Sequence, residues 1–256
     1  MDQSLSILFL GETTIAQSGS IKGYNVTFSI GYEESYLMMK DMIEKLGHTF
    51  TNIPSHLIAR DFPRTLEELK KYDVILVSDL GADIFLLLPE MCRTGKRAPN
   101  LLKLICDFVA DGGGFGMIGG YSTFQGYNAS GHYKGTPIES ILPVELLPYD
   151  DRREVPEGAD LVCDPSRSPL LKDLPEKWPY ILGYNRLIAK ENADVILEYD
   201  GDPIIALGRH GQGCTMAYAT DCTAHWAPAD MTNWEYYPVL WNRLLHWLAS
   251  GKAKKD

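Results

Sequence analysis

The chain has 256 residues, 45% of them hydrophobic, and carries a formal net charge of −10. This length can bury a sizeable core in one large domain. The acidic balance argues against nucleic acid or an anionic membrane as a partner, because both need clustered Lys and Arg, and the one basic cluster is KAKK at 252–255. No apolar run approaches the ~20 residues that span a bilayer. The five cysteines lack paired spacing, so we expect a cytoplasmic protein with reduced thiols.

The first half of the chain alternates between strand and helix patterns. Helical spacing runs over residues 32–46, a capping box formed by Thr65 and Glu68 opens a second helix, and 101–109 gives a third. The strand patterns precede, separate and follow these helices, at LSILFL (5–10), HTFTNI (48–53), DVILVSD (73–79) and FGMIGG (115–120). This order predicts an α/β protein with a flavodoxin-like, doubly wound parallel sheet.

The second half has a different character. Residues 136–202 are rich in proline and charge and offer only short strands, and hairpin turns are indicated at Asp200-Gly201 and at 209–213. We therefore expect an added antiparallel strand meander, whose last strand (214–219) returns to the main sheet before a C-terminal helix. The prediction is one domain over 1–256, made of a parallel core of about 1–130 and 203–250 and an inserted strand-rich part of about 136–202.

Polar or permissive residues follow each predicted core strand. Parallel sheets bind ligands at the carboxyl ends of their strands, so these loops are expected to share one edge. Each element also has an ordinary structural interpretation: a turn cap for Asp79, tight packing for the glycines, a half-buried histidine for His225. The coincidence of four loops favours a binding site. Its candidate residues are Glu12, Asp79, Gly119, Gly120, Tyr121, Ser122, Asp221, His225 and Trp226.

Several longer segments resemble the family of putative glutamine amidotransferase-like domains. They are LGE (10–12), FPRTLEELKKYDVILVSD (62–79), GGGFGMIGGYSTFQGY, GTPIESILPVELLP, GQGCTMAYATDCTAHWAP and YYPVLWNRLLHWL. That family looks like a branch of the class I glutamine amidotransferase-like superfamily, related to trehalose-utilisation-type domains. The resemblance covers nearly the whole chain and implies the same α/β fold.

The sequence departs from that superfamily where its active members carry their chemistry. Those members use a cysteine in a Gly-x-Cys-x-Gly elbow, with a histidine followed closely by a glutamate. Here Tyr121 stands at the nucleophile position, and a phenol is a poor acyl-transfer nucleophile. His225 lies roughly where the family histidine belongs, but its nearest carboxylate, Asp221, precedes it. The glutaminase triad is therefore not intact.

Three other roles remain open for these residues. Ser122 could be a nucleophile with His225 as base and Asp221 as orienting group. Cys222 could act with His225, although the charge of Asp221 would raise the pKa of the thiol. Tyr121 could donate a hydrogen bond to a ligand. Asp221, Cys222 and His225 form at most one loop of mixed metal ligands, so we expect neither a metal nor another cofactor.

Three functions are consistent with this sequence. The leading hypothesis is a protein without glutaminase activity that binds a small polar ligand or a partner at the carboxyl edge of the sheet. The second is an atypical hydrolase or transferase that uses Ser122 or Cys222 with His225. The third is an assembly module, because the aromatic residues of 226–241 could anchor an interface as well as fill a core. We expect a homo-oligomer, and whether the chain is an enzyme at all stays open.

Overall fold

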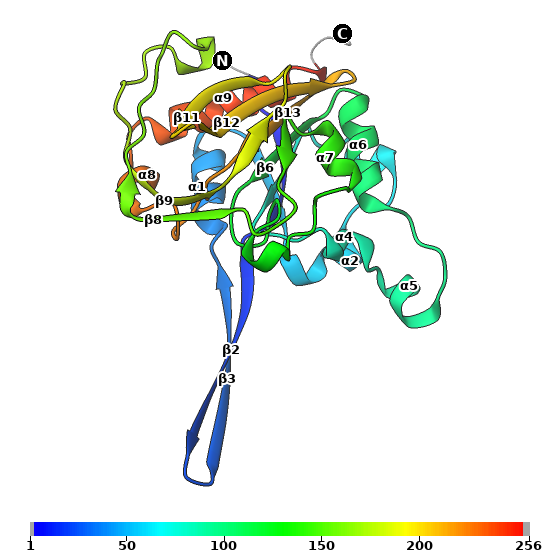
Figure 1. Ribbon diagram of the computed structural model, residues 1–256. Helices are drawn as coiled ribbons and strands as arrows, with labels where there is room; N and C mark the ends of the chain where they lie inside the picture. The colour runs from blue at the N-terminus through cyan, green and yellow to red at the C-terminus, as the bar shows by residue number, and fades with distance from the viewer. Residues whose placement is uncertain (1–2, 253–256) are drawn as a thin grey trace.

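The computed structural model describes residues 3–252 and is built around one seven-stranded sheet (Figure 1). Its strand order is β11-β12-β13-β6-β5-β1-β4. The five strands from β13 to β4 run parallel. β12 pairs antiparallel with β13, and the edge strand β11 pairs antiparallel with β12. In chain order the seven strands are β1 (Ser6–Gly11), β4 (Thr49–Ile53), β5 (Val74–Ser78), β6 (Gly114–Ile118), β11 (Asp194–Tyr199), β12 (Asp202–His210) and β13 (Gly213–Tyr218).

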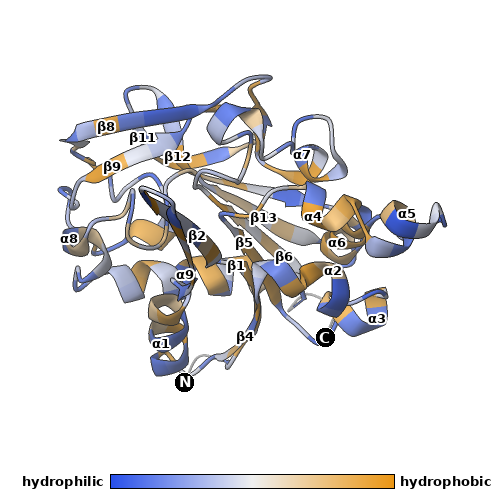
Figure 2. Cartoon of the chain, turned by 90° about the horizontal axis from the view of Figure 1, so that it is seen from below, coloured by the Kyte–Doolittle hydropathy of each residue, from blue (hydrophilic) through white to orange (hydrophobic). Residues whose placement is uncertain are grey.

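Helices cover both faces of this sheet, which accounts for its apolar strands. Every residue of β5, β6 and β13 is buried. Figures 1 and 2 show α1 and α9 on one face, with the short helix α8 on their side, and α6 with α4 and α7 on the other. The α-helices are α1 (Leu37–Lys45), α2 (Ile58–Asp61), α3 (Leu66–Leu69), α4 (Asp83–Leu86), α5 (Pro89–Thr94), α6 (Leu101–Ala110), α7 (Pro137–Ile141), α8 (Ala229–Thr232) and α9 (Tyr237–Ala249); three 3₁₀ turns, at Ser55–Leu57, Tyr127–Ala129 and Pro169–Leu171, complete the helical elements.

The strand-rich second half forms the smaller sheets as well as the antiparallel edge. Both predicted hairpin turns are confirmed: Tyr199 pairs with Asp202 across the first, and His210 pairs with Gly213 across the second. The strand β11 falls inside the part expected to be inserted, yet it is an edge strand of the main sheet. The additional strands are β7 (Val144–Leu146) with β10 (Leu187–Ala189), and β8 (Arg152–Ala159) with β9 (Ile181–Asn185).

The first predicted helix begins later than expected. The sequence predicted a helix over 32–46, whereas α1 starts at Leu37 and the residues before it belong to a hairpin of β2 (Thr13–Lys22) and β3 (Asn25–Glu34). The buried face of α1, with Met39 and Ile43, agrees with the prediction. The hairpin projects away from the body of the molecule as a long two-stranded ribbon (Figure 1).

Two further expectations concern the ends and the aromatic residues of the chain. Of the KAKK run, only Lys252 lies within the described residues. Trp226, Tyr237 and Trp241 are fully buried, so these aromatic side chains of 226–241 belong to the core and do not form an exposed interface. Within 3–252, no helix combines the length and the apolar character needed to cross a membrane.

Candidate functional site

Four neighbouring parallel strands deliver polar residues to one edge of the sheet. Glu12 follows β1, Asp79 follows β5, Gly119 follows β6, and Asp221 lies three residues after β13. Hydrogen bonds join these strand ends directly. Ser78 donates its hydroxyl to Glu12 at 2.6 Å, and the backbone N–H of Ser122 donates to Asp79 at 2.7 Å. The loops that the sequence analysis singled out therefore lie side by side.

The backbone at this edge is strained at residues that have side chains. Glu12 has a φ of 52°, Asp79 of 42° and His225 of 150°, all in the region that favours glycine. Each such residue costs free energy that the surrounding fold must offset, and strain of this kind clusters at functional sites. Three strained residues on three neighbouring loops therefore mark this edge of the sheet as the candidate site.

Glu12, Asp221 and Cys222 form a buried acidic cluster on one side of the site. Oxygens of Glu12 accept hydrogen bonds from the hydroxyls of Ser78 and Thr223, and Asp221 accepts the backbone N–H of Thr223 at 2.9 Å. Burial raises the pKa of Glu12 to about 7. Burial and the charge of Glu12 raise the pKa of Asp221 well above its ordinary value. The cluster therefore holds protons at neutral pH.

Among the described residues, this cluster is the group whose side chains lie close enough together to hold a metal ion. One atom each from Glu12, Asp221 and Cys222 lies within 4.8 Å of the others, and all three residues are buried. His225, which the sequence places in one loop with Asp221 and Cys222, is not in this set. Burial first, and then the carboxylates of Glu12 and Asp221, raise the pKa of Cys222. The thiol is therefore held in the protonated form, which is a poor metal ligand and a poor nucleophile.

The turn after β6 has its backbone N–H groups occupied by the protein itself. Gly119 donates to the carbonyl of Tyr218 at 2.7 Å, and Gly120 donates to Asn185 at 3.0 Å. Asp79 accepts the N–H of Ser122. Burial has the largest effect on the pKa of Asp79 and raises it, whereas hydrogen bonds from the backbone N–H groups of Ser122 and Tyr121 lower it. A side-chain carboxylate thus occupies the donors that an oxyanion would need.

The glycines of this turn are explained by close approach to other parts of the chain. A Cβ on Gly119 would lie 2.2 Å from the carbonyl oxygen of Ala219, and a Cβ on Gly120 would lie 2.7 Å from a carboxylate oxygen of Asp79. Gly120 also has a φ of 155°. No helix follows the turn directly, since the next helical element is the 3₁₀ turn at Tyr127–Ala129. A helix N-terminus that would stabilise a thiolate at the elbow is therefore missing from this part of the chain.

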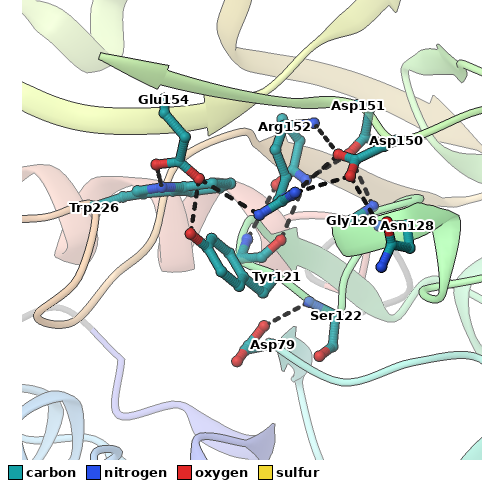
Figure 3. Close-up of polar contacts among 12 residues, drawn as sticks. Asp79, Tyr121, Ser122, Gly126, Asn128, Asp150, Asp151, Arg152, Glu154 and Trp226 are labelled. Carbon is teal, nitrogen blue, oxygen red and sulfur yellow. Dashed lines mark hydrogen bonds and ion pairs between the residues drawn. The ribbon is translucent and has the colours of Figure 1, made fainter. Parts of the chain in front are cut away.

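Tyr121 is held in a polar and aromatic cluster (Figure 3). Its hydroxyl donates to Glu154 at 2.8 Å, and the indole N–H of Trp226 donates to the same carboxylate at 3.0 Å. The guanidinium of Arg152 lies 4.5 Å from the centre of the Tyr121 ring, and His225 meets that ring edge-on at 4.5 Å. Partial burial and then Glu154 raise the pKa of Tyr121, so its phenol stays protonated.

The residues that fix Tyr121 and its turn come from the inserted part of the chain and were not predicted. Arg152 is itself held by Asp150, with N–O distances of 2.9 and 3.0 Å, and by stacking over Tyr127. Asn185 donates to the carbonyl of Gly120 and to Asp151. The signal in the sequence was weak: DDRRE stands in a charged stretch of the kind that usually forms a solvated face.

Within residues 3–252, no hydrogen bond joins His225 to the nucleophiles that the alternative catalytic arrangements would need, although the charge of His225 acts on Asp79 and lowers the pKa of that carboxyl. Cys222 is fully buried with its sulfur 3.6 Å from the Ser78 hydroxyl, whereas His225 is exposed and its ring contacts Tyr121 and Trp226. The hydroxyl of Ser122 bonds to Asp79 and helps lower the pKa of that carboxyl. Neither Ser122 nor Cys222 is paired with the His225 imidazole.

A pocket of about 290 Å³ opens beside the acidic cluster, at the base of the β2–β3 ribbon. It is lined by Thr13, Ile15, Ser55, His56, Leu80 and Ile84. Thr13 directly follows Glu12 and Leu80 directly follows Asp79, so the pocket adjoins the strained strand ends.

Comparison with known proteins places this chain in a family. Residues 6–250 match the family model described as putative glutamine amidotransferase. Two solved structures, the cytoplasmic proteins STM3548 of Salmonella typhimurium and STM1381 of Salmonella typhimurium LT2, are each 36% identical to the chain with a TM-score of 0.90. The first match covers 94% of this chain and 98% of the other, and the second covers 95% and 99%. No curated protein matches the chain significantly. The family model spans nearly the whole sequence, and the chain therefore belongs to the putative glutamine amidotransferase family.

Proposed function

We propose that this protein does not hydrolyse glutamine and instead binds a small polar ligand at the carboxyl edge of its sheet. The observation that carries the first part is the carboxylate of Asp79, which accepts the N–H groups of the elbow turn. Acyl transfer needs such donors to be free for the developing oxyanion. The phenol of Tyr121 adds a second obstacle, because it is protonated and donates to Glu154.

We expect that restoring the family nucleophile will not restore activity. The variant Tyr121→Cys should release no more ammonia from glutamine than the native chain, because Asp79 still occupies the oxyanion donors and no helix N-terminus activates the thiol. Ammonia release by purified protein, coupled to glutamate dehydrogenase, measures this. The matched control is Tyr149→Cys, which changes an exposed tyrosine. Glutamine hydrolysis by the native chain or by Tyr121→Cys would contradict the proposal.

The electrostatics of the site support a ligand that donates hydrogen bonds. Glu12, Asp79 and Asp221 converge at this edge, so the site is rich in carboxyl oxygens, which favour hydrogen-bond donors over anions as ligands. Hydroxyl or amine groups complement it. The strain at the three positive-φ residues is of the kind that positions side chains for a ligand.

A ligand panel tests this part of the proposal. We expect thermal stabilisation of the native chain by glycerol, glucose, ethanolamine or putrescine, and none by phosphate or citrate. The response should be lost in Asp79→Asn and kept in Asp107→Asn, whose aspartate pairs with Lys103 on the exposed face of α6. Stabilisation by the anions alone, or an equal response of both variants, would count against the proposal.

We also propose a cytoplasmic location for this chain. The two Salmonella proteins are described as cytoplasmic, which supports it.

A hydrolase that uses His225 with Ser122 or Cys222 has less support, since the imidazole packs on Tyr121 and Trp226 instead. Labelling with fluorophosphonate or iodoacetamide that depends on His225 would favour that alternative.

A further inference from the structure

The β2–β3 ribbon presents one continuous apolar face to solvent. Strand pairing places Ile15 opposite Tyr32 and Ile21 opposite Val26, with Phe28 and Ile30 between them on the same face. All six side chains are exposed, Phe28 at 67% and Ile30 at 74%. The Phe28 ring lies over Gly19, where a Cβ would come within 3.3 Å of it. From Ile15 to Ile21 and from Val26 to Tyr32 no charged residue stands on this face, which also includes Gln17 and Gly19; Glu34 lies on it only at the base, opposite Thr13.

The opposite face of the ribbon has the reverse character. It carries Ser18 and Ser29, whose hydroxyls are 2.6 Å apart, and continues with small or polar residues along both strands. The alternation is therefore that of a sheet with one side buried and one side in water. In the described structure, no other part of the chain packs on the apolar face of the ribbon except at its base.

A ribbon of this kind needs a cover to be stable. An isolated two-stranded hairpin is marginal in water, and it gains stability when its apolar face packs against something. Exposed apolar faces with polar surroundings mark interaction surfaces. The length of β2 and β3, ten residues each, carries this face far beyond the body of its own chain (Figure 1).

We propose that the ribbon is an arm exchanged between two copies of this chain. The apolar face of one ribbon packs antiparallel on the same face of the other, around a two-fold axis. This arrangement places the tip of each ribbon at the base of its partner. Tyr24 stands at the tip, fully exposed, and the pocket of about 290 Å³ lies at the base.

The tip and the pocket suit each other chemically. The pocket has apolar walls from Ile15, Leu80 and Ile84, and polar groups from Ser55 and His56. A tyrosine, with an apolar ring and a hydroxyl at its end, complements such a lining. Ile15 belongs both to the pocket and to the apolar face of the ribbon, so the two surfaces are continuous. Tyr24 of the partner subunit would then border the candidate site.

Area and charge favour a second copy over the other possible occupants. Each strand of the ribbon is ~34 Å long and the ribbon is ~10 Å wide, which gives a face of ~340 Å². Two such faces together with two filled pockets approach the lower end of specific interfaces, roughly 1,200 Å². An anionic membrane is disfavoured because the chain carries a net charge of −10, and Lys22 is the one basic residue of the ribbon.

The test is the mass of the full chain in solution, measured by light scattering after size exclusion and by sedimentation at several concentrations. We expect a dimer of the 28.7 kDa chain. The double substitution Phe28→Ser and Ile30→Ser should raise the dimer dissociation constant at least about a hundredfold, because four apolar contacts are lost per dimer. Tyr24→Ala should raise it about tenfold. The matched control, Thr27→Ala with Ser29→Ala on the polar face, should remain dimeric.

A second measurement locates the tip. With Cys92, the exposed native thiol, replaced by Ser, the pair Tyr24→Cys and Ile84→Cys should form a disulfide between copies under mild oxidation, whereas Tyr24→Cys with Asp107→Cys should not. A monomeric native chain, a dimer indifferent to the apolar-face variant, or binding of the native chain to anionic vesicles with no dimer would overturn the proposal. Circular dichroism of each variant checks that the body remains folded.

Discussion

The variant Glu12→Gln is expected to be more stable than the native protein at pH 8, and about equal to it near pH 4.5. Glu12 is buried with a pKa raised to about 7, mainly because burial disfavours its charged form. The free energy of unfolding depends on pH wherever the folded and unfolded states bind protons differently. Here the folded state binds its proton more tightly than the unfolded state, in which the pKa is 4.5.

The direction of the effect follows from this difference. A raised acid pKa gives a contribution to stability that is complete below pH 4.5 and is lost as the pH rises through about 7. The loss amounts to about 3 kcal/mol when one pKa unit corresponds to ~1.4 kcal/mol. Glutamine is neutral throughout, still accepts the hydroxyl of Ser78, and removes the charge that raises the pKa of Asp221. The variant should therefore show a flatter pH profile.

Urea unfolding of both proteins between pH 4.5 and pH 8.5 measures this profile. The matched control is Glu44→Gln, at an exposed glutamate of α1, which should follow the native curve. A native stability that stays constant or rises over this range would show that Glu12 is ionised in the folded protein. A loss of stability in Glu12→Gln at pH 8 would lead to the same conclusion, because it would mean that the carboxylate is needed there.

The parallel core could be predicted because its strands are buried on both faces. Residues 5–10, 73–79 and 115–120 are apolar runs bounded by turn residues, and helices with clear periodicity separate them. Once that order is recognised, the topology itself brings Glu12, Asp79 and the turn after β6 to one edge. This part of the site can therefore be predicted without knowledge of side-chain contacts.

The ribbon was missed because no element was predicted over residues 13–31, and because the helical pattern predicted over 32–46 took in the end of β3. Tyr36, Met39 and Ile43 do mark a helix, but the segment before them alternates with period two, from Val26 to Tyr32. Gly23, with a φ of 61°, supplies the turn. The alternation was readable in the sequence. It was not used as a strand signal because the described part of the chain provides no core that covers this apolar face.

The supports of the elbow turn could not be predicted, for a different reason. These supports are single long-range contacts made by Arg152, Glu154 and Asn185. Neither periodicity nor spacing in the sequence predicts which residues form such contacts. The sequence also gives no indication of the positive φ of Glu12 and Asp79, because tertiary contacts impose this backbone conformation on residue types that do not prefer it. Sequence patterns therefore located the edge of the sheet, whereas the reason for its altered chemistry lies in these contacts.

The second large effect is expected at Asn185, which is fully buried and holds both sides of the Gly120 peptide. Its side chain accepts the N–H of Gly120 at 3.0 Å, donates to the carbonyl of Gly120 at 3.2 Å, and donates to Asp151 at 2.7 Å. Asn185→Ala removes all three bonds and leaves buried polar groups without them. We expect a loss of roughly 3–5 kcal/mol in the free energy of unfolding. The exposed Asn192→Ala should change it by less than about 0.5 kcal/mol.

A second substitution at the same position separates lost hydrogen bonds from a merely tight fit. Asn185→Asp keeps the shape but places a carboxyl next to that of Asp151, which already accepts the N–H groups of Gln125 and Gly126. Repulsion and burial raise the pKa of the introduced acid, so its stability should fall as the pH rises from 5 to 8. Asn185→Ala should show no such added slope. If both variants lost the same stability at every pH, the amide would act as a space-filling group only, and the hydrogen-bonding account of the elbow turn would be wrong.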